Sequence, residues 1–151
     1  MAPSAEIANQ VANAWGPTLT KAFKEEDVSG FRAMFVTDQP VGCILNGPDG
    51  GELEFTVGDD AETATLTWDE FLKQTCQDLK AQDFSKTESQ CLGMLGDRII
   101  LESGRFNSSG EVYHEGYMLV TLNDEGKILL VEAFAGIGAA SLEAMATAKK
   151  K

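Results

Sequence analysis

The second half of the chain alternates apolar and polar residues with a period of two, and three short groups of turn residues interrupt the alternation. The turns fall at 96–97, 107–110 and 123–126, which are rich in Asn, Asp and Gly. Alternation of this kind is typical of strands, and such turns reverse the chain. We therefore expect strands over 86–95, 98–106, 111–122 and 127–135. Because loops this short cannot make parallel crossovers, the strands should form an antiparallel meander.

The first third of the chain has a helical period instead. Gly16 and Pro17 interrupt the apolar stripe of the first helix, and we expect a kink or a restart there, since proline removes a backbone hydrogen bond. A second short helix should follow, capped by Asp27. The stripe of the first helix consists of Ile7, Val11, Trp15, Leu19 and Phe23. The inward side of the second helix consists of Phe31, Met34 and Phe35.

The middle of the chain holds a reversal and a third helix. Two apolar runs flank a group of turn residues between 41 and 56, which predicts a hairpin or a loose loop. Thr67 and Glu70 have the spacing of a capping box at the start of the third helix. The acidic residues before it, Asp59, Asp60 and Glu62, lack the spacing and glycine of a calcium-binding EF-hand, so we expect a solvated loop.

Composition limits the possible partners. The chain has 151 residues, 43% of them hydrophobic, which suits one soluble domain over 1–136 with a tail over 137–151 that forms a short helix or frays. A net charge of −12 disfavours nucleic acid and anionic membranes. An odd number of cysteines and the absence of a visible secretory signal suggest a reduced, cytoplasmic protein. With one histidine, we expect no His-based metal cluster, and we expect no cofactor.

Counting by twos from the turns assigns the residues of the meander to two faces. On the inward face, Gln90, Ser103 and His114 fall in one polar row, with Glu88 and Arg105 beside it. Small residues next to polar groups suit the mouth of a pocket. The inward face as a whole comprises Glu88, Gln90, Leu92, Met94, Ile99, Leu101, Ser103, Arg105, Val112, His114, Gly116, Met118, Val120, Leu122, Leu129, Val131, Ala133 and Ala135.

The opposite face carries too much apolar area for a freely solvated sheet. We expect a partner subunit to cover it in a homodimer; the alternative is a second layer made by the chain's own first strands. The apolar residues of this face are Ile100, Phe106, Tyr113, Tyr117, Leu119, Ile128, Leu130 and Phe134, mixed with Glu102, Glu115 and Glu132.

Two segments resemble the NTF2-like (SnoaL-like) superfamily. The run DVSGFRAMFVTD over 27–38 is similar to the family's second helix, and GYMLVTLNDEGKILLVEAFAG over 116–136 is similar to its last hairpin. The resemblance implies an α+β cone in which three N-terminal helices pack on a curved antiparallel sheet. It does not imply one activity, because the fold hosts isomerases, cyclases, dehydratases, hydrolases and binding modules.

The steroid isomerases of this superfamily use a tyrosine, a carboxylate base and a protonated carboxylic acid. The resemblance puts these three roles on Leu19, Cys43 and Met118. None of the three side chains can perform them, so steroid isomerisation is excluded.

Three residues are candidates for chemistry. His114 could carry a proton in catalysis, oriented by Ser103 or Gln90, or could be a histidine that is merely hydrogen-bonded at the sheet edge. Arg105 could bind a substrate carboxylate or pair with Glu88. Cys43 could be a reactive thiol, although an inert buried thiol is the simpler interpretation.

The sequence thus predicts a SnoaL-like protein whose apolar pocket binds a small hydrophobic molecule. A reaction there would be a cofactor-free isomerisation, cyclisation or dehydration with His114 as the proton carrier. The alternative is a non-catalytic dimerisation or binding module. The predicted substrate-binding residues are Trp15, Cys43, Gln90, Leu101, Ser103, Arg105, Met118, Val131 and Ala133.

Overall fold

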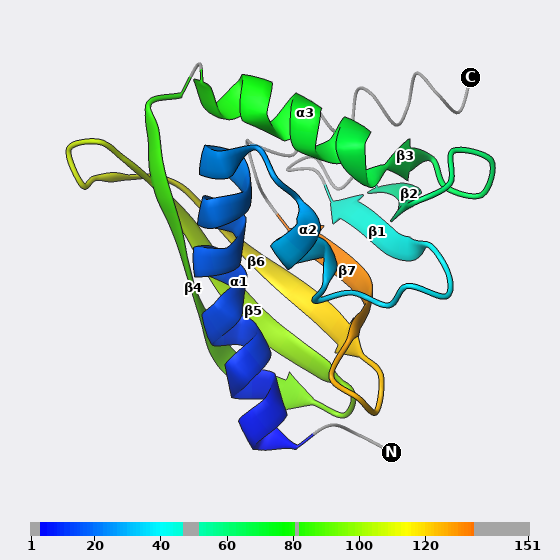
Figure 1. The fold of residues 1–151 in the computed structure, drawn as a ribbon. Coiled ribbons are helices and arrows are strands. Elements are labelled where there is room, and N and C mark those ends of the chain that lie inside the picture. Colours follow the sequence, from blue (N-terminus) through cyan, green and yellow to red (C-terminus); the bar gives the residue numbers. More distant parts are fainter. Residues whose placement is uncertain (1–3, 47–51, 81, 135–151) are drawn as a thin grey trace.

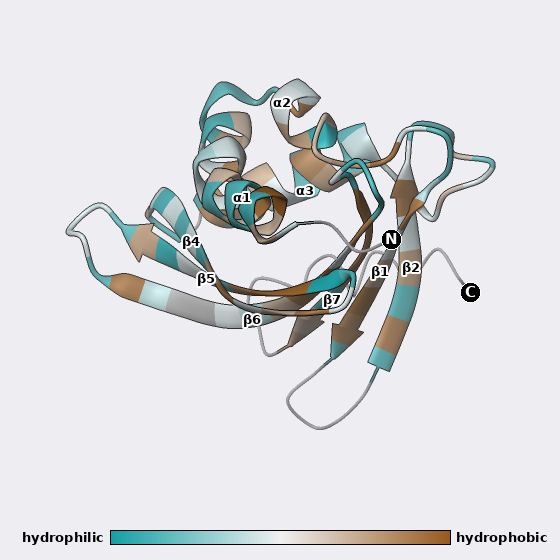
Figure 2. Cartoon of the chain, turned by 90° about the horizontal axis from the view of Figure 1, so that it is seen from below, coloured by the Kyte–Doolittle hydropathy of each residue, from teal (hydrophilic) through white to brown (hydrophobic). Residues whose placement is uncertain are grey.

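The computed structural model describes residues 4–46, 52–80 and 82–134, with the backbone alone for His114 and Glu115. A mixed, strongly curved sheet holds three helices on its concave side (Figures 1 and 2). The helices are α1 (Ala5–Glu25), α2 (Ser29–Arg32) and α3 (Trp68–Lys80). The strands are β1 (Val41–Asn46), β2 (Glu52–Gly58), β3 (Leu66–Thr67), β4 (Phe84–Leu95), β5 (Arg98–Asn107), β6 (Val112–Leu122) and β7 (Ile128–Phe134). The tail expected over 137–151 lies outside the described residues.

The predicted meander is confirmed as β4 to β7, with antiparallel pairing throughout. Each connecting turn contains a glycine at positive φ, namely Gly96, Gly110 and Gly126, as a reversal of this kind requires. The expectation of a wholly antiparallel sheet is wrong, because β1 pairs in parallel with β7. The sheet order is β3-β2-β1-β7-β6-β5-β4. The parallel pairing joins the hairpin β1–β2 to the meander and extends the sheet over the helices.

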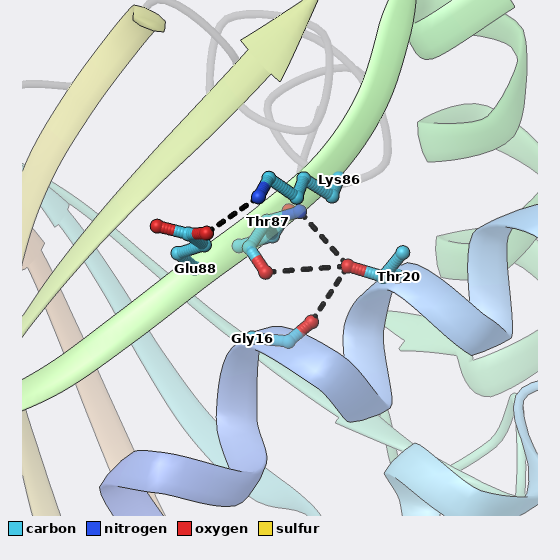
Figure 3. Close-up of polar contacts among 5 residues, drawn as sticks. All are labelled: Gly16, Thr20, Lys86, Thr87 and Glu88. Carbon is cyan, nitrogen blue, oxygen red and sulfur yellow. Dashed lines mark hydrogen bonds and ion pairs between the residues drawn. The ribbon is translucent and has the colours of Figure 1, made fainter. Parts of the chain in front are cut away.

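Helix α1 continues through Pro17, so of the kink or restart expected there, the restart does not occur. Strand β4 supplies hydrogen-bonding groups at this point of the helix. Ser89 Oγ accepts from the Gly16 N–H at 2.7 Å and donates to the Ala12 carbonyl at 2.6 Å. One turn later, Thr20 Oγ1 lies 2.8 Å from the Gly16 carbonyl and accepts from the Thr87 N–H at 2.8 Å (Figure 3). These contacts thus hold α1 against β4 at the point where Pro17 interrupts the backbone hydrogen bonds of the helix.

The predicted capping box of α3 is confirmed, whereas the N-cap of α2 is Val28 rather than the predicted Asp27, which lies one residue earlier. Asp27 Oδ1 accepts from the Ser29 N–H at 3.0 Å at the start of α2. Thr67 and Glu70 exchange hydrogen bonds of 3.2 Å before α3, which is the reciprocal pattern of a capping box. In the acidic loop, Asp59 forms an exposed ion pair with Arg32.

The predicted inward face is right for β5 and largely for β6, but it is wrong for most of β4. A register shift between Cys91 and Gly93 inserts Leu92 as an extra residue and reverses the faces beyond it. Leu92 is 50% exposed, and Glu88 and Gln90 are exposed as well. The residues of β4 that pair opposite Arg105, Ser103 and Leu101 are instead Thr87, Ser89 and Cys91.

A second register shift, between Thr121 and Leu122, changes the start of β7. It brings Ile128 opposite Leu122, and Ile128 is fully buried in the core rather than on the outer face. The Val36 N–H donates to the Ile128 carbonyl at 3.0 Å, and the Ile128 N–H donates to the Met34 carbonyl at 2.9 Å. Phe35, between these two residues, forms an isolated bridge to Ile128. These hydrogen bonds hold the segment after α2 against the sheet.

The convex face of the sheet carries none of the helices (Figure 2). The chain's own first strands do not form a second layer over it, because β1 and β2 continue the same sheet. Within residues 4–46, 52–80 and 82–134, no helix has the length and apolar character needed to cross a lipid bilayer.

Candidate functional site

A cavity of about 170 Å³ lies between the helices and the concave side of the sheet. All three helices contribute to its wall, together with both the β1–β2 hairpin and the meander. Most of the lining is apolar. Its volume is comparable to the engineered apolar cavity of about 150 Å³ that binds benzene.

The helical wall of the cavity is aromatic. Phe31 of α2 lies at its centre, with its ring centroid 5.1 Å from Trp15 of α1 and 4.9 Å from Phe35. From α3, Trp68 lies 4.9 Å from Phe35, and Phe71 stacks on Phe31 at 6.0 Å. These are the separations that aromatic pairs prefer. The five rings are therefore core residues, as their helical spacing predicts, and they present the same apolar surface to the cavity.

The hairpin β1–β2 provides a second wall that the sequence analysis missed, except for Cys43. Val41, Cys43 and Leu45 line the cavity from β1, and Phe55 and Val57 line it from β2. In each strand these residues are two positions apart, which is the period of one sheet face. The alternation in the sequence therefore indicates which residues of β1 and β2 share a face. It does not indicate that this face lies beside the meander, because that depends on the parallel pairing of β1 with β7.

The surroundings of the half-buried Cys43 thiol favour the inert interpretation over a nucleophile. Burial raises its pKa to about 12, so the thiolate is scarcely populated near neutral pH. Cys43, Leu19 and Met118, which the resemblance places at the steroid isomerase positions, all line the cavity. The three positions are thus part of one site, and their side chains supply apolar surface.

The polar part of the lining is small and comes mainly from β4 and β5. Arg105 is the only charged side chain among the described lining residues. It lies opposite Thr87 in the β4–β5 register, and Ser103 lies opposite Ser89. Burial lowers the pKa of the Arg105 guanidinium, and the nearby Tyr113 and Asp78 oppose this effect. The predicted Arg105–Glu88 pair is wrong, because Glu88 lies on the other face and pairs with Lys86 at 2.6 Å.

His114 lies opposite Arg105 in the β5–β6 register. The predicted row of Gln90, Ser103 and His114 is therefore wrong, because Ser103 lies opposite Gly116 and Gln90 lies opposite Glu102. The side chain of His114 lies outside what the structure describes. Its backbone position is two residues from Gly116, which lines the cavity.

Most of the predicted binding residues come together around the cavity. Two do not. Leu101 is fully buried in the core and does not reach the lining, and Gln90 donates to Glu102 at 2.7 Å on the exposed face. The predicted residues that line the cavity are Trp15, Cys43, Ser103, Arg105, Met118, Val131 and Ala133.

Two polar residues of the lining, Thr75 and Thr87, were not predicted from the sequence. Regular counting along β4, without the bulge at Leu92, leaves Thr87 off the inward face. Gly93 was a sign of the bulge in the sequence, since a glycine inside a strand often marks an irregularity. Among the described residues, no group of three or more His, Cys, Asp or Glu side chains is arranged to hold a metal ion.

Comparison with known proteins identifies a fold but no close relative. No protein-family model matches the chain, and no curated protein matches it. PrhC from Penicillium brasilianum matches with a TM-score of 0.51 and 10% identity, over 96% of this chain and 91% of that one. A protein with a cystatin-like fold from Methylobium petroleophilum matches with a TM-score of 0.50 and 13% identity, over 89% and 78%.

A SnoaL-like protein from Agrobacterium tumefaciens also matches, with a TM-score of 0.45 and 13% identity over 78% of this chain and 91% of that one. Identities this low bear on the fold and not on the activity. The curved sheet and the helices on its concave side agree with the two matches whose TM-scores reach 0.50. The chain therefore has a cystatin-like α+β fold, with helices packed on a curved sheet as its sequence predicts.

Proposed function

We propose that this protein binds a small, mainly apolar molecule in the cavity between its helices and its sheet. The observation that carries the proposal is the cavity itself: about 170 Å³ of space with an aromatic wall and, among the described lining residues, one charged side chain. A core evolved only for stability packs to the density of an organic crystal, with few voids larger than a water molecule. The unfilled volume therefore favours a binding site over a module whose interior is closed by its own side chains.

A thermal-shift titration with toluene and indole tests this proposal. A ligand that binds only the folded chain stabilises it by RT ln(1 + [L]/Kd), about 2.7 kcal/mol at a hundredfold excess over Kd. We expect either probe to raise the Tm. Ala133→Leu places bulk in the cavity and should abolish the shift, whereas Ala61→Leu, in the exposed loop before β3, should leave it intact. The absence of a shift with the unmodified chain would favour a non-catalytic module with a closed interior.

If the site is catalytic, the proposed reaction is a cofactor-free isomerisation, cyclisation or dehydration in which His114 carries the proton. The support for this role is the register of His114 opposite Arg105 and two residues from a lining glycine. In the simplest step, the imidazole takes a proton from carbon next to a carbonyl group, and the resulting enolate recovers a proton at the same or another atom.

Deuterium exchange of 2-indanone in D₂O, followed by proton NMR, tests the proton transfer. The protein should accelerate loss of the protons next to the carbonyl, and His114→Ala should return the rate to the background. His114→Gln keeps a side chain that can form hydrogen bonds but cannot accept a proton near neutral pH, so this variant should also be inactive. Exchange at an unchanged rate in both variants would remove the histidine from the mechanism and leave a binding protein.

We also propose that a second copy of the chain covers the convex face. Tyr117 and Phe134, which the strand alternation assigns to this face, are register partners and are 50% and 38% exposed, and both also border the cavity. Light scattering should give a mass near twice 16.2 kDa. Leu119→Glu in the middle of this face should produce monomers, whereas Lys73→Glu, exposed on α3, should not. A monomeric unmodified chain at micromolar concentration contradicts the dimer.

A further inference from the structure

Arg105 is a cation at the wall of an apolar cavity. Its strand β5 runs through the middle of the meander, and the residues beside it in register are Thr87 of β4 and His114 of β6. Every other described residue of the lining is uncharged. A buried charge is costly unless an opposite charge or a set of hydrogen bonds compensates it.

Within the described residues, the guanidinium of Arg105 has neither an ion pair nor a hydrogen bond. The ion pairs that they form are Arg32–Asp59, Lys80–Glu26 and Lys86–Glu88, and the guanidinium of Arg105 takes part in none of them. Asp78 of α3 is near enough to raise the pKa of Arg105, but its carboxylate accepts from Gln74 Nε2 at 3.2 Å. The chain has 24 acidic residues against 12 basic ones, so an unpaired arginine is not explained by a shortage of carboxylates.

A buried hydroxyl next to Arg105 also lacks a partner. Thr87 is 4% exposed and lines the cavity, and its Oγ1 has no hydrogen bond in the described structure. The main chain of Thr87 is fixed by Thr20, whose Oγ1 accepts its N–H (Figure 3). The phenolic hydroxyl of Tyr113 is the other such atom, and Tyr113 is electrostatically coupled to Arg105. Each unsatisfied buried donor costs about 1–3 kcal/mol.

We propose that the ligand of this cavity is a small cyclic or aromatic carboxylate, with its carboxylate group on Arg105 and Thr87 and its ring against the aromatic wall. This inference rests on the proposed function and adds the class of ligand to it. A guanidinium presents paired donors that match the two oxygens of a carboxylate, and Thr87 Oγ1 supplies a further donor. The ligand thus provides the missing counter-charge, while its ring fills the apolar volume.

Calorimetric titration with phenylacetate and with phenylacetamide tests the inference, because the two probes have similar shape and differ in charge. We expect the unmodified chain to bind phenylacetate at least tenfold more tightly than phenylacetamide. Arg105→Met should remove this preference, and toluene should still bind to the variant. Thr87→Val should weaken phenylacetate severalfold. Lys86→Met is the matched control: it removes a cation from the adjacent position of β4 on the exposed face and should change neither affinity.

The possible results separate the inference from the proposed function. If toluene binds and phenylacetate has no advantage over its amide, the cavity is an apolar site and the carboxylate class is wrong. If none of the three probes binds, the proposed function itself fails. If Arg105→Met does not fold, the affinities of phenylacetate and phenylacetamide for the unmodified chain still test the inference, because equal affinities contradict it. Thr87→Val gives a second test, because an unchanged affinity for phenylacetate in this variant also contradicts the inference.

Discussion

Ser89 of β4 and Gly16 of α1 are joined by a hydrogen bond of 2.7 Å, in which the helix N–H donates to the serine hydroxyl. The same hydroxyl donates to the carbonyl of Ala12 at 2.6 Å, so one side chain of the sheet satisfies both a donor and an acceptor of the helix. The contact occurs immediately before Pro17, where the helix cannot form its own full ladder. Strand β4 therefore substitutes for part of the hydrogen bonding of α1.

Ser89→Ala should destabilise the protein because it leaves the two backbone groups of α1 without this partner. We expect a loss of about 1–3 kcal/mol in the free energy of unfolding, measured by urea denaturation. Ser85→Ala is the control, since Ser85 is half-buried in the same strand and its hydroxyl forms no hydrogen bond within the described residues. Equal effects of the two substitutions would contradict the role of Ser89.

Gly16→Ala should be destabilising although alanine is normally the better helix residue. A Cβ at this position would lie 2.6 Å from the Thr87 carbonyl oxygen and 2.9 Å from Glu88 Cα, so α1 must move away from β4. We expect a loss of about 1–3 kcal/mol from overpacking. Gly30→Ala in α2 meets no atom closer than 4.0 Å and should be neutral or stabilising by up to about 1 kcal/mol. A stable Gly16→Ala protein would show that the approach of helix and strand is not tight.

Thr67→Ala removes the cap of α3, because Thr67 Oγ1 accepts the N–H of Glu70. The expected loss is about 1 kcal/mol in the free energy of unfolding, and thermal denaturation measures it. Thr67→Ser keeps the hydroxyl and should recover most of the stability. A serine variant as unstable as the alanine variant would assign the effect to packing of the threonine methyl group instead.

Cys43 should resist alkylation in the folded protein. Burial raises its pKa to about 12, and only the thiolate reacts rapidly with iodoacetamide. At pH 8, mass spectrometry should show that Cys43 is modified many times more slowly in the native chain than in urea. Equal rates in the two states would contradict the burial of the thiol.

The same shift makes the contribution of Cys43 to stability depend on pH. The unfolded chain releases the thiol proton near its ordinary pKa of about 8.5, whereas the folded chain keeps it up to about pH 12. The contribution is therefore complete below about pH 8.5 and is lost as the pH rises towards 12. The difference in unfolding free energy between the unmodified chain and Cys43→Ala should fall across this window, and a constant difference would contradict it.

Local signals in the sequence were sufficient for most elements of the fold. The capping box of Thr67 and Glu70 and the glycines of the three turns act within a few residues, so their outcome does not depend on the rest of the chain. The meander follows from them, because its loops are too short for other connections. The parallel pairing of β1 with β7 depends on contacts distant in sequence, and the pattern of either strand alone does not indicate it.

The site was predictable only as far as the strand register was regular. Met118 and Ala133 are register partners in an uninterrupted stretch of β6 and β7, and they line the cavity as expected. Arg105 also lines it, because the register shift in the β5–β6 pairing falls only after it, between Arg105 and Phe106. Gln90 and Thr87 lie on the faces opposite to those that regular counting predicts, because β4 contains one extra residue, Leu92. An insertion of one residue reverses every side chain beyond it, so a single unrecognised bulge was enough to misplace the polar end of the site.

The parallel pairing of β1 with β7 also constrains how the protein reaches its native state. Gly42 and Leu130 are neighbours in the sheet although roughly 90 residues separate them in sequence, and such distant contacts slow folding because a long loop must close first. During synthesis the hairpin of β1 and β2 emerges long before its partner strand. The wall that Cys43 and Leu45 give to the cavity is therefore completed late, when the last strand of the meander has been made.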